Sequence, residues 1–163
     1  MPKDFKIYYC EKITDEISEH VENVLRDLFG LQFRSVGVHI PRVNAWDDHS
    51  NAYDARNLLE QMVAERLSFF LWLITVPISL DQKSIFGYAE PLKGTIVSTS
   101  KMATRTLVAK EAAYFVGIVL GLSSCRNECL MQSAENFEVL INKPSTLCST
   151  CNAKYNRLKL RYM

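Results

Sequence analysis

Four of the five cysteines lie close together in the last quarter of the chain, in two short-spaced pairs. Cys125 and Cys129 enclose three residues, and Cys148 and Cys151 form a CxxC motif. Zinc takes four ligands at the corners of a tetrahedron, and two such pairs joined by a loop supply them. Four unrelated buried thiols and an iron–sulfur cluster are the alternatives, although the spacings do not match ferredoxins. We expect one structural zinc, whose four thiolates leave no position for a catalytic water.

The composition is that of a globular protein with one domain over residues 1–163. Hydrophobic residues make up 48% and charged residues 23%, which excludes a disordered chain. A formal net charge of +1 gives no overall attraction to nucleic acids or anionic membranes. The longest apolar run, at residues 67–80, is broken by polar residues and is too short to cross a bilayer. Because no signal peptide is recognisable either, we expect a cytoplasmic protein without a membrane partner.

Apolar periodicity divides the chain into alternating strands and helices. Helical spacing occurs from Thr14 to Gly30, around residues 58–67 and from Thr104 to about Leu122. Strands are expected at residues 5–10, 33–40, 69–76, 85–91 and 95–100, and a polar loop at 42–51. The apolar segment 69–76 is typical of a strand buried on both faces, and 85–91 of an edge strand. This order predicts an α/β (α+β) fold with a mixed sheet of about five strands and a C-terminal zinc-knuckle region at 125–163.

Two segments resemble the archaemetzincins, which are zinc peptidases of the metzincin type. They are KEAAYFVGIVLGLSSCRNECLM at 110–131 and KPSTLCSTCNAK at 143–154. In the family pattern an HExxHxxGxxHC motif precedes a second cysteine, a CxM turn and a distal CxxC. The segment IFGYAEPLKGTIVS at 85–98 is similar to the family's FVFGEAxLGG segment. The resemblance covers residues 50–155 and implies a twisted metzincin-like sheet with backing and active-site helices. It also implies that Met131 corresponds to the turn methionine below the metal.

The catalytic residues of that family pattern are missing from this chain. Alignment on the motif places Tyr114, Ile118 and Ser124 at the three zinc histidines and Phe115 at the catalytic glutamate. In the pattern, histidines at i and i+4 hold zinc and the glutamate activates the bound water. A phenol with a pKa near 10 is a poor zinc ligand, and no histidine lies in the second half of the chain. The resemblance therefore predicts a pseudo-peptidase that is not an enzyme, with a cleft that these side chains plug or make shallow.

A binding or regulatory protein with one structural zinc is the predicted function. A peptide or protein partner would pair with the edge strand Ile85–Glu90, because strand addition needs only free backbone groups. The alternatives are a zinc-dependent metallopeptidase with non-standard ligands and a zinc-stabilised nucleic-acid-binding module. The nucleic-acid alternative depends on residues 142–163, which contain five basic residues and no acidic one. We expect these charges to offset the zinc thiolates, which makes nucleic acid an unlikely partner. Glu111 is interpreted as a helix-surface residue, and Cys10 as a small buried hydrophobe.

Overall fold

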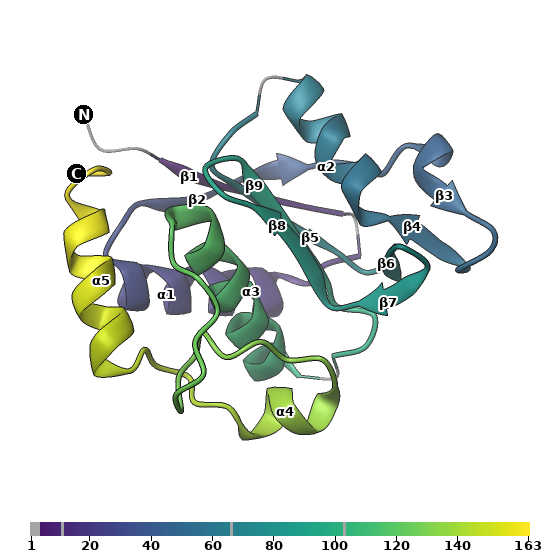
Figure 1. Ribbon diagram of the computed structural model, residues 1–163. Helices are drawn as coiled ribbons and strands as arrows, with labels where there is room; N and C mark the ends of the chain where they lie inside the picture. The colour runs from purple at the N-terminus through teal and green to yellow at the C-terminus, as the bar shows by residue number, and fades with distance from the viewer. Residues whose placement is uncertain (1–3, 11, 66, 103) are drawn as a thin grey trace.

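The computed structural model describes residues 4–10, 12–65, 67–102 and 104–163. A five-stranded sheet with the order β2-β1-β5-β9-β8 forms its centre (Figure 1). Its strands are β1 (Phe5–Tyr9), β2 (Phe33–Val38), β5 (Phe70–Ile74), β8 (Gly87–Glu90) and β9 (Gly94–Ser98). Four of them are parallel, whereas β8 pairs antiparallel with β9 and ends the sheet. The predicted α/β fold with a mixed sheet of about five strands is confirmed.

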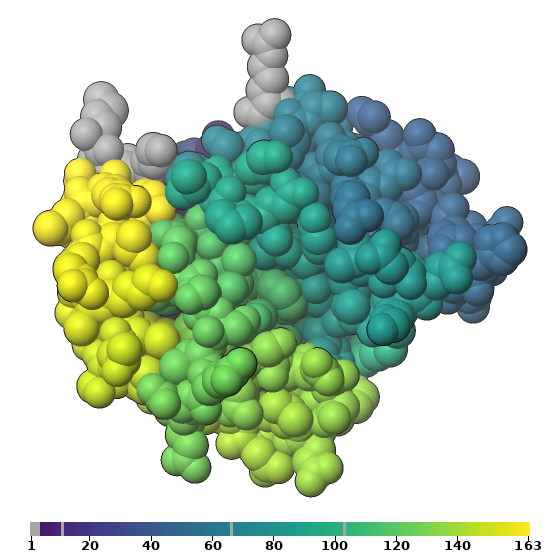
Figure 2. Space-filling view, in the orientation of Figure 1, coloured from purple at the N-terminus to yellow at the C-terminus, as the bar shows by residue number. Residues whose placement is uncertain are grey.

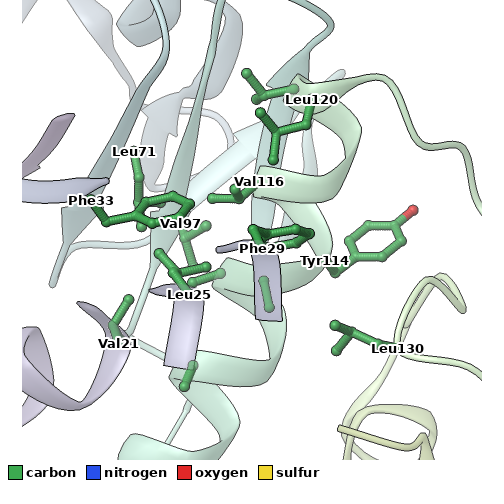
Figure 3. Packing of buried hydrophobic residues seen from close by; sticks show 14 of the residues in the cluster. Val21, Leu25, Phe29, Phe33, Leu71, Val97, Tyr114, Val116, Leu120 and Leu130 are labelled. Carbon is green, nitrogen blue, oxygen red and sulfur yellow. The ribbon is translucent and has the colours of Figure 1, made fainter. Parts of the chain in front are cut away.

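Helices cover both faces of this sheet, which explains why the middle strand is apolar throughout. On one face lie α1 (Asp15–Phe29) and α3 (Arg105–Leu120), and α2 (Ala55–Ala64) packs on the other. All five residues of β5 are buried, with alternate side chains in the two cores. Figure 3 shows the first core, where apolar side chains of α1 and α3 meet those of the sheet.

The long helices begin and end at residues that satisfy their backbone groups. The hydroxyls of Thr14 and Thr104 accept hydrogen bonds from N–H groups in the first turns of α1 and α3. Gly30 and Gly121 end these helices with positive φ angles of 62° and 110°, which favour glycine. Thr14, Gly30 and Thr104 are the boundaries that the sequence predicted, whereas α3 ends slightly before the expected end at about Leu122.

A second, smaller sheet of four short strands was not predicted from the sequence. Its order is β3-β4-β6-β7. Its strands are β3 (Trp46–Asp47), β4 (Ala52–Asp54), β6 (Ile78–Leu80) and β7 (Lys83–Ile85). A short 3-10 helix, η1 (Val43–Ala45), precedes β3. The segment 42–51, expected as a polar loop, consists of the short 3-10 helix η1, the two-residue strand β3 and the turns after it. Strands of two or three residues are too short to give a recognisable alternation of polar and apolar residues.

Two further helices, α4 (Phe137–Asn142) and α5 (Ser149–Lys159), follow α3. The hydroxyl of Tyr155, on α5, donates to the carbonyl of Phe29 at 2.6 Å, and the two rings are 5.1 Å apart. Tyr162 donates to the carbonyl of Leu120 at 2.7 Å. These contacts hold α5 beside the ends of α1 and α3, as Figure 1 shows at the yellow end of the chain. Within the described residues, no helix has the length and apolar character needed to cross a membrane.

Candidate metal centre and cleft

The four predicted cysteine ligands converge on one point. The Sγ atoms of Cys125, Cys129, Cys148 and Cys151 all lie within 4.8 Å of one another, and those of Cys125 and Cys148 are 3.9 Å apart. Zn–S bonds of about 2.3 Å in a tetrahedron place the sulfurs about 3.8 Å apart. The spacing therefore fits a metal ion of the size of zinc, and among the described residues this is the only cluster of its kind.

Backbone N–H groups and burial set the acidity of these thiols. The Sγ of Cys148 caps α5 by accepting from the N–H of Cys151 at 3.5 Å, and this bond lowers the pKa of Cys148 to about 6. Cys129 accepts from the N–H groups of Met131 and Cys148 at 3.4 and 3.2 Å, but burial raises its pKa. Burial also raises the pKa of Cys151. A divalent cation would supply the positive charge that ionisation of these thiols requires.

The four positions aligned with the family's catalytic residues lie together on and after α3. Tyr114 is buried, and its hydroxyl is 2.6 Å from the hydroxyl of Ser124, which is exposed. Phe115 packs edge to face against Tyr114, with ring centroids 4.9 Å apart. Ile118 is half-buried one turn further on. Met131 is fully buried and packs closely on Gly117 of α3. A Cβ atom added to this glycine would lie 2.7 Å from the Sδ of Met131. The structure thus brings all five predicted residues to one side of α3.

Two of these side chains, Tyr114 and Phe115, line a cleft but do not fill it. A cavity of about 450 Å³ lies between the β7–β8 segment, α3 and residues 133–135, with Tyr114 and Phe115 in its wall. The ring of Phe115 lies against Gly87, where an added Cβ would come within 2.5 Å of it. The ring is therefore accommodated beside β8 because residue 87 has no side chain. The expectation was a plugged or shallow cleft, and the structure shows that the two rings leave the cavity unplugged. In Figure 2 the teal β7–β8 segment lies beside the green segments that follow it.

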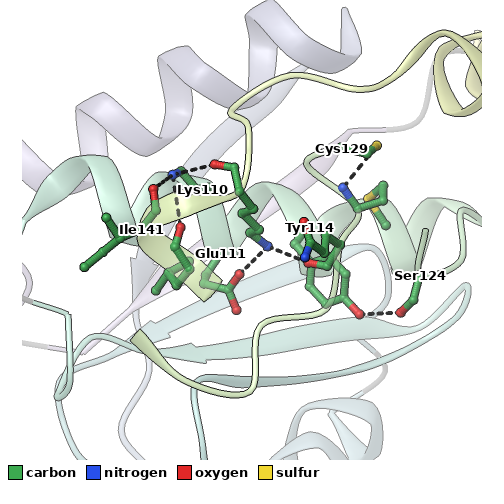
Figure 4. A network of polar contacts seen from close by, with 10 residues as sticks. Lys110, Glu111, Tyr114, Ser124, Cys129 and Ile141 are labelled. Atoms are coloured by element: carbon green, nitrogen blue, oxygen red, sulfur yellow. Dashed lines mark hydrogen bonds and ion pairs between the residues drawn. The ribbon is translucent and has the colours of Figure 1, made fainter. Parts of the chain in front are cut away.

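A buried ion pair beside Tyr114 was missed by the sequence analysis (Figure 4). The Nζ of Lys143 lies 2.6 Å from Oε1 of Glu111, and the two side chains are 0% and 1% exposed. Nζ also donates to the carbonyl of Gln132 at 3.0 Å and lies 4.5 Å from the Tyr114 ring centroid. Burial raises the pKa of Glu111 and lowers the pKa of Lys143, and the charge of each partner opposes these shifts. The prediction that Glu111 lies on the surface is wrong.

A second buried lysine attaches the segment after Met131 to α3. The Nζ of Lys110 donates to the carbonyls of Leu140, Ile141 and Lys143 at 3.0, 3.2 and 2.9 Å. These carbonyls belong to the end of α4, where cations are favourable. The available signal was two neighbouring charges, Lys110 and Glu111, inside the apolar stretch of α3, since such charges are buried only when they are paired.

The residues of the cleft do not fit a second zinc. Phe115 and Ile118 carry no donor atom, and the hydroxyls of Tyr114 and Ser124 are engaged with each other. These four side chains therefore do not form a zinc site. The Cys10 thiol, half-buried far along the chain from the cluster, lies 3.3 Å from the hydroxyl of Thr75.

Comparison with known proteins shows similarity to archaemetzincins. No family model matches the chain. An archaemetzincin of Nanoarchaeum equitans is 26% identical over 136 residues, covering 82% of this chain and 79% of that protein. One from Archaeoglobus fulgidus is 35% identical over 78 residues, which cover 43% of this chain and 48% of the relative. The solved archaemetzincin of Methanopyrus kandleri has a TM-score of 0.87 at 18% identity and covers 98% of this chain and 96% of its own.

These comparisons correct the prediction that the chain is not an enzyme. The relatives are archaemetzincins, and a solved structure from Methanocorpusculum labreanum is described as a zinc-dependent peptidase. It has a TM-score of 0.82 at 20% identity and covers 94% of this chain and all of its own. The absence of histidine ligands excludes one type of metal site, and it does not by itself exclude activity.

The fold and the cysteine cluster agree with this relationship. The archaemetzincin of Archaeoglobus fulgidus, solved in complex with malonate, has a TM-score of 0.84 at 21% identity and covers 93% of this chain and 99% of that structure. The four cysteines near the C-terminus form a cluster that could bind a metal. The curated relatives and the solved structures together identify an archaemetzincin-type zinc peptidase fold in this chain.

Proposed function

We propose that this protein acts on peptides, which pair with the free edge of β8 and lie in the cleft beside α3. The observation that carries the proposal is the 450 Å³ cleft, whose wall includes the β7–β8 segment. Strand β8 is the last strand of the sheet, so one of its edges has no partner strand among the described residues. An extended peptide can bind such an edge through main-chain hydrogen bonds alone.

The pairing with β9 indicates which backbone groups of β8 face the peptide. The N–H of Ser98, on β9, donates to the carbonyl of Phe86, so the backbone carbonyl of Phe86 points toward β9. Because antiparallel pairs alternate, the N–H groups of Gly87 and Ala89 point away from β9. They lie within the segment Ile85–Glu90, which the sequence predicted as the surface for a partner.

Replacing Ala89 by proline tests this arrangement. Proline removes one outward N–H and leaves the inward hydrogen bonds of β8 in place, as edge strands permit. We expect Ala89→Pro to weaken binding of a mixed peptide library at least about tenfold, the value of one lost hydrogen bond. The matched control Ala89→Ser keeps the N–H and should bind as the unmodified protein does. Equal binding by both variants would contradict the proposal.

Hydrolysis of the bound peptide is favoured by the comparisons, which point to a peptidase. Such an activity must use groups other than a zinc ion held by Tyr114, Ile118 and Ser124. Mass spectrometry of the same incubations measures it. Slower product formation with Ala89→Pro than with Ala89→Ser assigns cleavage to this cleft, whereas equal rates of product formation assign it elsewhere. Regulatory capture of a partner's peptide segment is the second use that the free edge of β8 supports.

One structural zinc at the cysteine cluster completes the proposal. The spacing of the four sulfurs supports it, and the ion would join the loop at residues 125–131 to the start of α5. Its binding would contribute to folding of the C-terminal region. Elemental analysis of the purified protein should give one zinc per chain. Two zinc ions per chain would contradict the assignment.

A further inference from the structure

The inner wall of the cleft contains a carboxylate oxygen without a partner. Oε1 of Glu111 is bound by Lys143, whereas Oε2 has no hydrogen-bond partner among the described residues. Figure 4 shows this second oxygen directed away from Lys143. The side chain is 1% exposed and forms part of the cleft wall. Buried acceptors are nearly always satisfied, so an unsatisfied one at a cleft indicates where a ligand's donor binds.

The charges around Glu111 determine the kind of donor that fits. Lys143 offsets the carboxylate at 2.6 Å, and the buried Lys110, one residue earlier on α3, also acts electrostatically on it. An incoming ammonium or guanidinium group would meet two cations and one anion. A neutral N–H adds no charge, and a peptide paired with β8 turns every second N–H away from that strand. A backbone amide is therefore the suitable donor.

The outer part of the cleft differs from the inner part in that its charged side chains are exposed. Its wall contains the exposed residues Lys83 and Lys101, and neither forms an ion pair with another described residue. Apart from Glu111, the wall has one acidic residue, Glu135. The exposed charges of the wall thus sum to a net positive value, which attracts an anionic group.

We propose that the cleft selects peptides that carry a carboxylate, with a backbone N–H donated to Oε2 of Glu111 and the carboxylate beside Lys83 and Lys101. The inference rests on the proposed function and adds the class of peptide. The carboxylate can be the peptide's C-terminus or an aspartate or glutamate side chain, and both sources have the same chemistry at the two lysines.

Three labelled hexa-alanine peptides distinguish the sources. One has a C-terminal amide, one a free C-terminal carboxylate, and one a C-terminal amide with a central glutamate. Fluorescence anisotropy with the full, zinc-containing chain gives the dissociation constants. We expect at least one carboxylate peptide to bind about tenfold more tightly than the neutral peptide, and which one does so identifies the source. Methylation of the amide nitrogen that reaches Glu111 should weaken binding about tenfold.

Variants of the wall test the named residues. The double variant Lys83→Met/Lys101→Met should lose the preference for carboxylate peptides, and Lys12→Met, an exposed lysine outside the wall, should keep it. Glu111→Gln should lose the sensitivity to amide methylation. Should that variant fail to fold, the lysine variants and the methylated peptides still decide the question.

The outcomes separate this inference from the proposed function. Equal affinity for the three peptides, or tighter binding of a lysine-containing peptide, overturns the selectivity and leaves peptide binding intact. Absence of binding by every peptide overturns both. An unchanged preference in the double lysine variant also overturns the assignment of the carboxylate site.

Discussion

Replacing Lys143 by methionine removes the cation that contacts Glu111 and leaves a carboxylate in the core without its partner. Both side chains are almost fully buried, and their atoms are 2.6 Å apart. Removing one member of a buried ion pair destabilises proteins by about 3–5 kcal/mol. We expect a loss of this size in the free energy of unfolding, measured by urea titration with tryptophan fluorescence. Since domains are stable by about 5–15 kcal/mol, the loss should be easy to detect.

The pH dependence of this variant gives a second measurement. Burial already raises the pKa of Glu111, and removing Lys143 raises it further. The folded state of the variant then keeps a proton that the unfolded state releases above about pH 4.3. Stability from such a group is present below that pH and is lost as the pH rises through the folded-state pKa. The difference between the variant and the unmodified protein should therefore be larger at pH 8 than at pH 5.

Two controls identify the origin of the loss. Arg105 lies 3.4 Å from Glu16 in an ion pair whose side chains are 53% and 71% exposed. Arg105→Met should cost less than about 1 kcal/mol, because exposed pairs contribute little. The double variant Glu111→Leu/Lys143→Met removes both charges and should recover most of the stability. The reasoning is refuted if Lys143→Met is as mild as Arg105→Met, or if the double variant is no more stable than the single one.

Three other changes have expected outcomes. Cys151→Ser should abolish zinc binding and sharply lower the melting temperature. The control Cys10→Ser should leave the zinc content unchanged. Equal zinc content in the two variants would contradict the metal site. Tyr155→Phe should cost about 1 kcal/mol at pH 7. Burial raises the pKa of Tyr155, so its stabilisation is present below about pH 10 and is lost as pH rises further. The variant should therefore lose less stability than the unmodified protein between pH 10 and 11. Gly87→Ala should displace the ring of Phe115 and reduce peptide binding, as anisotropy and aromatic NMR shifts would show.

The main elements could be predicted because their sequence signals are local. The helices after Thr14 and Thr104 have apolar periodicity with capping residues, and 69–76 is apolar on both faces of the sheet. The small second sheet has no such signal. Its strands are two or three residues long. They depend on contacts between distant parts of the sequence, such as the hydrogen bond of 2.9 Å between the hydroxyls of Ser50 and Ser79, which are 29 residues apart in the chain.

The cysteine cluster could be predicted from spacing, whereas the interior of the cleft could not. Glu111 and Lys143 are 32 residues apart and lie on different elements, so neither has a local pattern that reveals the other. Glu111 does precede Tyr114 by three residues, which places both on one helix face. The open cleft depends on the direction of the Phe115 ring, and the fit of that ring against Gly87 is a tertiary contact.

The contact between Tyr155 and Phe29 joins residues 126 positions apart. At about 5–20 residues per second, a ribosome needs roughly 6–25 s to synthesise the intervening chain. Throughout that interval the end of α1 lacks the aromatic ring that covers part of Phe29. The nascent protein therefore leaves this apolar surface uncovered, and it completes its core only after α5 has left the ribosome.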